Sequence, residues 1–360
     1  MRFIGAVIEK LQRHPKRIVF PEGMEPRVLQ AARQFHSLRL GAPILLGDRA
    51  KIAQAAKTLN IPLQGIRIIN PAESEDLDNF TRRFKSLHRA KGMKAPEARD
   101  AMLNPNFFGA MMVAMRQADG FVSGTNAVTS SVLRPLLQII RRTPHANTTA
   151  SCIVMEFENT RIGEDGVLFM ADCDVVIEPT TKQVADIALS TARLARHLMG
   201  TCPRVALLSF STKGSATHPS AGKMQAAAAL AAQMAKETGL AADFDGELQA
   251  DTAIVPEIAA RKAPESKVAG QANVLIFPDL NAANIASKLV HGISRANAYG
   301  HLLLGLDRPA ADVSRGSAAH ELLGVAAIVG VEAVAYSQLY PGSGQLLLNA
   351  QKRPSKSSVG

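Results

Sequence analysis

Aromatic residues are scarce in this chain, which has no Trp and an aromatic content of only 4%. Surfaces that bind nucleic acid usually carry aromatic side chains on which the bases stack. The chain is nevertheless basic, because 41 Lys and Arg outnumber 31 Asp and Glu and leave a formal net charge of +10. The basic residues are spread along the sequence, so we expect small phosphorylated anions as partners and no nucleic acid.

Cysteine is also rare, and Cys152, Cys173 and Cys202 form no CxxC pair. This pattern indicates neither a disulfide framework nor a zinc site, and it fits the reducing cytoplasm. No uncharged stretch stays apolar for about 18 residues without Gly or Pro, and the N-terminal apolar run is too short for a signal peptide. We therefore expect a cytoplasmic protein that does not enter a membrane.

Common cofactor motifs are missing as well. A P-loop needs a second Gly followed by Lys and Ser or Thr, and the nearest candidate, Gly222-Lys223-Met224, lacks the hydroxyl. His320-Glu321 begins like a zinc-protease helix, but Gly324 stands where the second His would be needed. We expect no bound metal.

Short β-branched runs alternate with longer Ala/Leu-rich runs, which is typical of an α/β fold with a mostly parallel sheet. A length of 360 residues favours two domains, and a polar stretch at 141–149 is a plausible crossing between them. Strands are predicted at 17–21, 43–47, 119–123, 149–155, 167–170, 175–178, 204–209 and 274–278. Helices are predicted at 25–38, 130–140, 182–197, 220–237 and 282–290.

Two polar segments follow predicted strands, where α/β proteins commonly bind ligands. The first contains Ser211, Thr212, Lys213, Gly214 and Ser215, and its hydroxyls, Gly and Lys suit a phosphate cradle. A plain turn with a solvated Lys is an equally good interpretation of these residues alone.

The second polar segment pairs Ser314 with Arg315 and continues to Glu321 on a helical run. A hydroxyl beside a guanidinium suits a phosphoryl oxygen, and a carboxylate two turns along suits a proton acceptor. A helix cap with an exposed Arg and a surface Glu is the competing interpretation.

From about Lys16 to Ala335 the chain resembles the phosphate acetyltransferase (phosphotransacetylase) family, including its ethanolamine-utilisation type. The blocks that carry the resemblance occur in order along the chain: RIVFPEGMEPRVLQAA, ADGFVSG, LRPLLQII, ADCDVVIEPT, PRVALLSFSTKGSA, FDGELQADTA, KAPESKVAGQANVLIFPDLNAANI and DVSRGSAAHEL.

The resemblance implies two three-layer α/β/α domains with an interdomain cleft, in which residues 1–145 plus 309–345 form the first domain. Residues 146–308 would form the second domain, and 346–360 a mobile tail. It further implies reversible acetyl transfer between acetyl phosphate and coenzyme A, with inorganic phosphate as the other partner, no cofactor and a homodimer. Two alternatives are a sensing domain that binds acyl-CoA or acetyl phosphate without turnover, and a transferase for a longer acyl group such as butyryl.

The resemblance also assigns roles to single residues. Arg134 matches a family arginine that holds phosphate, Ser314 and Arg315 match the acyl-phosphate centre, and Glu321 stands where many members have Asp as base. Cys173 matches a cysteine near the site, but no His or Lys lies beside it, so we expect a packed bystander. Substrate contacts are expected from the Ser211–Ser215 segment and from Ser123, Gly124, Thr129, Arg89 and Asn281.

Two positions depart from the pattern of many members. His88 replaces the first Arg of an Arg-Lys-x-Lys-Gly run, and the neighbouring Arg89 is a possible substitute. Ala127 replaces a His in the loop after Ser123-Gly124. These changes concern contacts to phosphate or coenzyme A and leave the central Ser, Arg and Glu unchanged.

Overall fold

One mixed sheet runs through the whole protein. The computed structural model describes residues 2–144 and 146–334. Its strands are β1 (Lys16–Phe20), β2 (Gly41–Leu46), β3 (Arg67–Ile69), β4 (Gly120–Ser123), β5 (Ala150–Glu156), β6 (Val167–Ala171), β7 (Arg204–Leu208), β8 (Asp243–Leu248), β9 (Val274–Ile276), β10 (Asn297–Leu304) and β11 (Ala310–Asp312). Within these residues they lie in the order β3-β2-β1-β4-β11-β10-β5-β6-β9-β7-β8.

The sheet consists of two parallel halves joined by an antiparallel centre. β3, β2, β1, β4 and β11 are mutually parallel, and so are β6, β9, β7 and β8. Between them, β11 with β10, β10 with β5 and β5 with β6 all pair in antiparallel fashion. Three reversals make the two halves run in opposite senses. The polar segments after β7 and β11 therefore follow strands of opposite direction.

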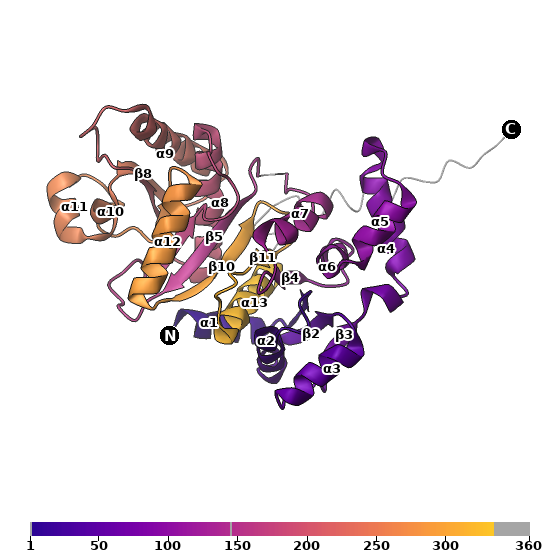
Figure 1. Ribbon diagram of the computed structural model, residues 1–360. Helices are drawn as coiled ribbons and strands as arrows, with labels where there is room; N and C mark the ends of the chain where they lie inside the picture. Colours follow the sequence, from indigo (N-terminus) through magenta and orange to yellow (C-terminus); the bar gives the residue numbers. More distant parts are fainter. Residues whose placement is uncertain (1, 145, 335–360) are drawn as a thin grey trace.

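Helices cover both faces of the sheet, which makes three layers (Figure 1). Their bounds are α1 (Phe3–Gln12), α2 (Pro26–Ser37), α3 (Arg49–Thr58), α4 (Leu77–Leu87), α5 (Ala95–Leu103), α6 (Pro105–Ala114), α7 (Thr129–Ile139), α8 (Thr181–Met199), α9 (Pro219–Glu237), α10 (Ala250–Ile254), α11 (Pro256–Lys262), α12 (Leu280–Ser294) and α13 (Ala319–Val334), with 3-10 turns η1 (Pro71–Glu73) and η2 (Arg89–Lys91). The predicted α/β class with a mostly parallel sheet is confirmed.

The buried side chains explain why the molecule has two lobes. In β1, Ile18 and Phe20 point into one core while Val19 points into another, as the two-residue period of a strand requires. The first core extends along the whole sheet, from Ile18 to Val205 in β7. The opposite face carries two separate cores, one in each half. Figure 1 shows α4–α6 in one lobe and α9–α12 in the other.

Of the strands predicted from sequence, those near β1, β2, β4, β5, β6, β7 and β9 are confirmed, but the one at 175–178 is wrong. The carboxylate of Asp172 there accepts hydrogen bonds from the backbone N–H groups of Asp174, Val175 and Val176 at 3.1, 3.2 and 2.7 Å. A side chain that satisfies three successive amides holds the backbone in a turn and leaves none of them for a sheet.

β11 and α13 return to the N-terminal half of the sheet. β11 pairs with β4 as well as with β10, and α13 packs on α1, α2 and β4. The division into domains at 145 and 309 stays a prediction, and the tail at 346–360 lies outside the described residues. No helix among the described residues is long and apolar enough to cross a membrane.

Candidate active site

Three parallel strands bring the candidate site together. Val19 of β1 pairs with Phe121 of β4, and Ser123 at the end of β4 pairs with Asp312 at the end of β11. Parallel strands end at the same edge of a sheet, so the segments that follow β1, β4 and β11 lie side by side. Those segments carry Glu22, the loop 124–128 and the loop 313–318.

Glu22 organises the loop after β4. Its Oε2 accepts from the N–H groups of Gly124 and Thr125 at 2.9 and 2.7 Å and from the Thr125 hydroxyl at 2.5 Å. Its Oε1 accepts from the N–H groups of Asn126 and Ala127 at 2.8 and 2.9 Å. Burial alone would raise the pKa of Glu22, but these donors hold it below its usual range. Ala127, at the position where the resemblance leads us to expect His, thus contributes to the loop through its backbone N–H.

Arg27 at the start of α2 fixes the loop after β11. Its guanidinium donates to the carbonyls of Arg315 and Ser317 at 2.7 and 2.9 Å, and to the carbonyl of Thr125 at 3.0 Å. One planar, permanently charged group therefore ties both loops of the site to α2. The Arg315 backbone is held while its side chain remains exposed.

Ser314, Arg315 and Arg134 are the residues predicted to meet the acyl phosphate. Ser314 is half-buried, and its Oγ accepts weakly from the N–H of Gly316 at 3.3 Å. Arg134 is exposed on α7, which begins at Thr129 and packs against β11. Neither the Arg134 nor the Arg315 guanidinium is ion-paired within the part of the chain that the structure describes.

Gly124 and Ser123 allow β4 to meet β11 closely. Gly124 has a φ of +118°, and a Cβ there would lie 2.2 Å from Asp312 Oδ1. Only glycine fits this backbone conformation at so short an approach. Ser123 accepts from the Val313 N–H through its carbonyl at 2.7 Å and donates through its hydroxyl to Asn106 at 2.8 Å. Both residues shape the site from the backbone.

A pair of carboxyl groups, Asp174 and Asp312, lies beside this edge. The two side chains lie close enough for each to affect the pKa of the other, and Thr129 also affects the pKa of Asp312. Burial and the neighbouring carboxylate raise the pKa of Asp312 to about 8. Burial and the charge of Asp172 likewise raise the pKa of Asp174 to about 7.

Glu321 is buried, with only 4% of its surface exposed, so it is no surface residue. Its Oε2 accepts from the N–H of Ala318 at 2.8 Å across the first turn of α13, and its Oε1 accepts from the N–H of Ala298 at 3.0 Å. His291 Nε2 lies 3.4 Å from Oε1. Glu321 thus caps α13 and joins it to β10, while each oxygen keeps a lone pair for a further donor.

The polar groups of the Ser211–Ser215 segment are hydrogen-bonded within the protein. Glu247 accepts from the N–H of Gly214 at 2.7 Å and from the hydroxyl of Ser211 at 3.0 Å. The N–H of Thr212 donates to Ser215 Oγ at 3.0 Å. The amide groups expected to cradle a phosphate are therefore occupied by protein acceptors in this state.

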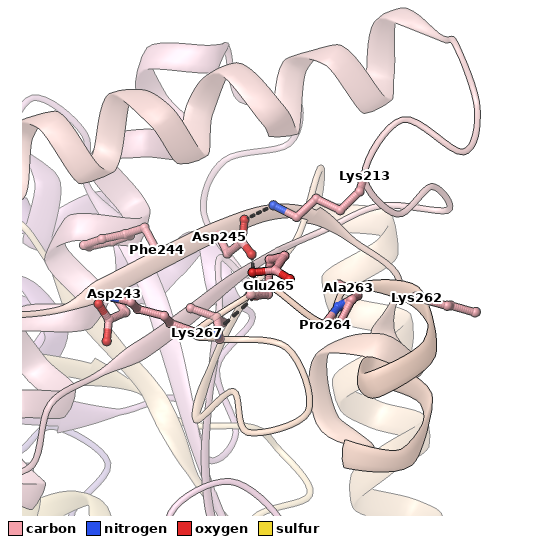
Figure 2. Close-up of a pocket in the computed structure, with 11 residues that line it drawn as sticks. Lys213, Asp243, Phe244, Asp245, Lys262, Ala263, Pro264, Glu265 and Lys267 are labelled. Atoms are coloured by element: carbon pink, nitrogen blue, oxygen red, sulfur yellow. Dashed lines mark hydrogen bonds and ion pairs between the residues drawn. The ribbon is translucent and has the colours of Figure 1, made fainter.

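Lys213 points into a cavity of about 540 Å³ (Figure 2). Figure 2 shows its amine reaching Asp245, with which it forms an ion pair, while Lys262 points away. The cavity lining contains acidic as well as basic side chains: Lys213, Lys262, Lys267, Asp243, Asp245 and Glu265. Lys213 would have to break its ion pair with Asp245 before it could bind a phosphate.

The remaining predicted residues are distributed widely. Arg89 is exposed in η2, and Asn281 is exposed in the first turn of α12. Cys173 is buried and donates through Sγ to the Met170 carbonyl at 3.4 Å. Burial raises the pKa of its thiol well above the usual value, which leaves it un-ionised.

Sequence reasoning missed four residues of this edge, namely Glu22, Arg27, Asp174 and Asp312. Glu22 and Asp312 each follow or end a buried strand, and that position was an available signal. Arg27 and Asp174 carried none, because the parts of the site that they contact, Thr125 for Arg27 and Asp312 for Asp174, lie 98 or more positions away in the chain.

The fold and the site define a two-lobed α/β protein with exposed arginines and a Ser hydroxyl beside strand ends, a class that suits transfer of a phosphate-linked group. The family described as phosphate acetyl/butaryl transferase matches residues 2–330. A phosphate acetyltransferase of Thermoanaerobacterium thermosaccharolyticum is 41% identical, covering 92% of this chain and 100% of the relative. The chain belongs to this family, and it is an acyltransferase.

Solved structures of phosphotransacetylases are also similar to this chain. A phosphotransacetylase from Streptococcus pyogenes is 38% identical with a TM-score of 0.84, and the match covers 92% of this chain and 98% of that one. The EutD phosphotransacetylase from Staphylococcus aureus is 37% identical with a TM-score of 0.82 at the same coverage. The resemblance inferred from the sequence blocks is confirmed.

Proposed function

We propose that this protein transfers an acetyl group reversibly between acetyl phosphate and coenzyme A by direct thiolate attack in a ternary complex. Membership of the family over most of the chain carries this proposal. Inorganic phosphate is the second product, and coenzyme A serves as substrate, so the reaction needs no resident cofactor or metal. The enzyme acts in the cytoplasm.

Thiol activation is the first step. A thiol with a pKa of about 8.5 is only a few per cent ionised at neutral pH, so a carboxylate that accepts its proton accelerates attack. Glu321 is assigned this role. Its buried position beside the loop 313–318 and its remaining lone pairs support the assignment. The sulfur then forms a bond to the acetyl carbon, the bond from that carbon to the phosphate oxygen breaks, and phosphate leaves.

Negative charge grows on the carbonyl oxygen and on the leaving phosphate during this attack. Arg134 and Arg315 are assigned to stabilise it, with Ser314 donating a hydrogen bond. Their exposure and lack of ion pairs among the described residues support this role, since a guanidinium already paired would have to break that contact first.

Coenzyme A is assigned to the remaining predicted residues. Arg89, Asn281 and Lys213 are exposed polar groups that suit the phosphates and the nucleotide. Ser123, Gly124 and Thr129 shape the loop beside the acyl phosphate. The Ser211–Ser215 segment takes part only after its contacts to Glu247 rearrange.

A homodimer completes the proposal. Ile285, Leu289 and Ile293 of α12 are exposed, Ile293 by 80%, and their spacing of four residues places them on one helix face. A contiguous exposed apolar patch of this kind marks protein contacts. Light scattering tests this proposal, and Leu289→Glu is expected to convert a dimer to a monomer.

An assay of the purified protein with acetyl phosphate and coenzyme A, followed by thioester absorbance, tests the activity. We expect turnover without added metal, and faster turnover with acetyl phosphate than with butyryl phosphate. Coenzyme A binding without turnover would instead establish a sensing domain. A preference for butyryl phosphate would leave the mechanism intact and change the acyl group.

A further inference from the structure

A cavity of about 770 Å³ lies at the edge of the sheet opposite the candidate active site. Its walls include the first residues of β1 and β2, Lys16 and Gly41, and the last residue of α2, Ser37. The candidate site lies instead at the carboxyl ends of β1, β4 and β11. Because β1 has five residues, its two ends are roughly 13 Å apart. The cavity is therefore separate from the site described above.

Basic side chains gather around this cavity. Four permanent cations from β1, from α2 and from the residue that follows Leu38 line it: Lys16, Arg17, Arg33 and Arg39. No Asp or Glu is among the described residues of the lining. Segments on two strands and one helix thus direct positive charge into one volume.

Two of these cations have protein partners. Arg17 forms an ion pair with Asp119 at 2.8 Å, which offsets its charge. Arg33 donates to two backbone carbonyls of the segment 62–64 at 3.4 and 3.0 Å. Carbonyls are neutral acceptors, so these bonds orient the Arg33 guanidinium and leave its charge in place. Both guanidinium groups are thereby fixed at the wall of the cavity.

The other two cations, Lys16 and Arg39, form no ion pair in the part of the chain that the structure describes. The N–H of Lys16 donates to the carbonyl of Leu40 at 3.1 Å, which holds the start of β1 against the residue after Arg39. The backbone therefore keeps two unpaired positive charges near each other. An anion between them would replace their repulsion with attraction.

Arg39 has a backbone conformation that favours glycine. Its φ is +57°, its N–H donates to the His36 carbonyl at 3.0 Å, and the N–H of Leu40 donates to the Phe35 carbonyl at 3.1 Å. These two bonds end α2 in a Schellman motif, in which glycine is usual because other side chains are strained there. Strain of this kind is found where a side chain has a function. The guanidinium of Arg39 is thus present in spite of a conformational cost.

The positive charge exceeds what the end of the helix can use. The C-terminal end of α2 carries about half a negative charge, and Asp119 offsets one of the four cations. About two and a half positive charges therefore remain around the cavity. Guanidinium groups bind two oxygens of a phosphate at once, and an ammonium group adds a point charge. The surplus suits a ligand with more than one phosphate group.

We propose that this cavity is a second anion site, which binds a small molecule with two or more linked phosphate groups. Its volume of about 770 Å³ lies in the range of about 300–1,000 Å³ that is usual for small-molecule sites. The proposal does not depend on the proposed function, because Lys16, Arg33 and Arg39 have no part in the acyl transfer.

Calorimetric titration of the full chain with inorganic pyrophosphate, without divalent cations and at about 0.1 M salt, tests the proposal. Lys16→Ala combined with Arg39→Gly should raise the Kd by about a hundredfold, or about tenfold for each charged donor that is lost. Lys236→Ala combined with Arg161→Ala is the matched control, since it removes one Lys and one Arg from exposed positions in the other half of the sheet. Its Kd should stay within about twofold of wild type.

Pyrophosphate also resembles the ligands of the candidate active site, so Arg134→Ala combined with Arg315→Ala is titrated in parallel. This variant should keep the binding that Lys16 and Arg39 provide. Binding that is lost in this variant and unchanged in the Lys16 and Arg39 variant would overturn the proposal, as would a wild type that binds no pyrophosphate. Turnover is measured separately, so binding at the cavity without turnover would refute the proposed function and leave the second site standing.

ADP distinguishes two sources of the same chemistry, because it carries the diphosphate on a nucleoside. A lower Kd for ADP than for pyrophosphate, lost together with Lys16 and Arg39, would assign the cavity to a nucleotide. A lower Kd for pyrophosphate would assign it to an inorganic phosphate chain.

Arg39→Gly alone separates a ligand site from a helix end. Glycine relieves the backbone at this position, so the melting temperature should equal or exceed that of wild type while the pyrophosphate Kd rises by about tenfold. An arginine that only stabilises the end of α2 predicts the opposite, a lower melting temperature with an unchanged Kd. That result would overturn the proposal.

Discussion

Glu321→Gln separates a catalytic carboxylate from a helix cap, because the structure gives this residue both possible roles. The carboxylate accepts from the N–H of Ala318 and from the N–H of Ala298 through different oxygens. Glutamine keeps the size of the side chain but has one carbonyl oxygen. One of the two buried N–H groups therefore loses its acceptor and faces an NH₂ group instead.

The loss of folding free energy caused by Glu321→Gln has an upper limit, because only one of the two N–H groups loses its acceptor. An unsatisfied buried donor costs about 1–3 kcal/mol, and a lost helix cap about 0.5–2 kcal/mol. A loss of about 3 kcal/mol from a stability of about 5 kcal/mol, the low end for natural proteins, still leaves more than about 95% of the molecules folded. Unfolding therefore removes only a few per cent of the activity, whereas loss of a general base lowers turnover by roughly 10² to 10⁴.

The assay is kcat with saturating acetyl phosphate and coenzyme A over a pH series, with a melting curve for each variant. Thiolate from solution rises by about tenfold or more from pH 7 to the thiol pKa of about 8.5, so the Gln variant should recover by about this factor. Thr180→Ala is the matched control, since it weakens the capping box of α8, a helix that carries none of the assigned site residues. If Glu321→Gln keeps kcat within about threefold of wild type and melts like Thr180→Ala, Glu321 is a cap and the base must be sought elsewhere.

Three further predictions use the same assay or a melting curve. Arg315→Ala and Arg134→Ala should each cost about 2–4 kcal/mol in kcat/KM, and a loss below about tenfold in both would contradict their electrostatic role. Arg89→Ala should raise the KM for coenzyme A and weaken its salt dependence with little effect on kcat, whereas an equal fall in kcat would make Arg89 catalytic. Burial raises the pKa of Glu332 to about 8, so its folded state loses stability as pH rises from the unfolded value toward 8. Glu332→Gln should therefore raise Tm by several degrees at about pH 8 and by less at about pH 5, and an equal change at both would refute this explanation.

The parallel strands and long helices could be predicted from sequence because their signal is local. Apolar runs such as Ile18-Val19-Phe20, buried on both faces of a parallel sheet, are continuous in the sequence. Val175 and Val176 have the same composition, and there the pattern failed, since the carboxylate of Asp172 takes their amides. A side chain outside an apolar run can take the backbone amides of that run, and the hydrophobicity of the run does not reveal this competition.

The antiparallel centre was not predicted for a related reason. β10 and β11 lie between β5 and β4, and their place in the sheet depends on pairings with residues about 140 or more positions earlier. The same applies to the site, where Arg27 reaches the Arg315 carbonyl across 288 positions. Ser314 and Arg134 were identified through family blocks, whereas the residues that hold those loops became visible only in three dimensions.

Several carboxyl groups lie near the site, and backbone amides stabilise two of them as carboxylates, Glu22 and Asp172. Glu22 accepts from the backbone amides of the loop 124–127, Asp172 accepts from those of the turn 174–176, and burial raises the pKa of Asp174 and of Asp312. Amide donors stabilise a carboxylate without pairing it with one of the cations that the ligand needs. Arg134 and Arg315 are thereby left as the cations available to the phosphoryl group. The acids instead hold the loops that surround those arginines, so substitution of Glu22 should displace the loop 124–127.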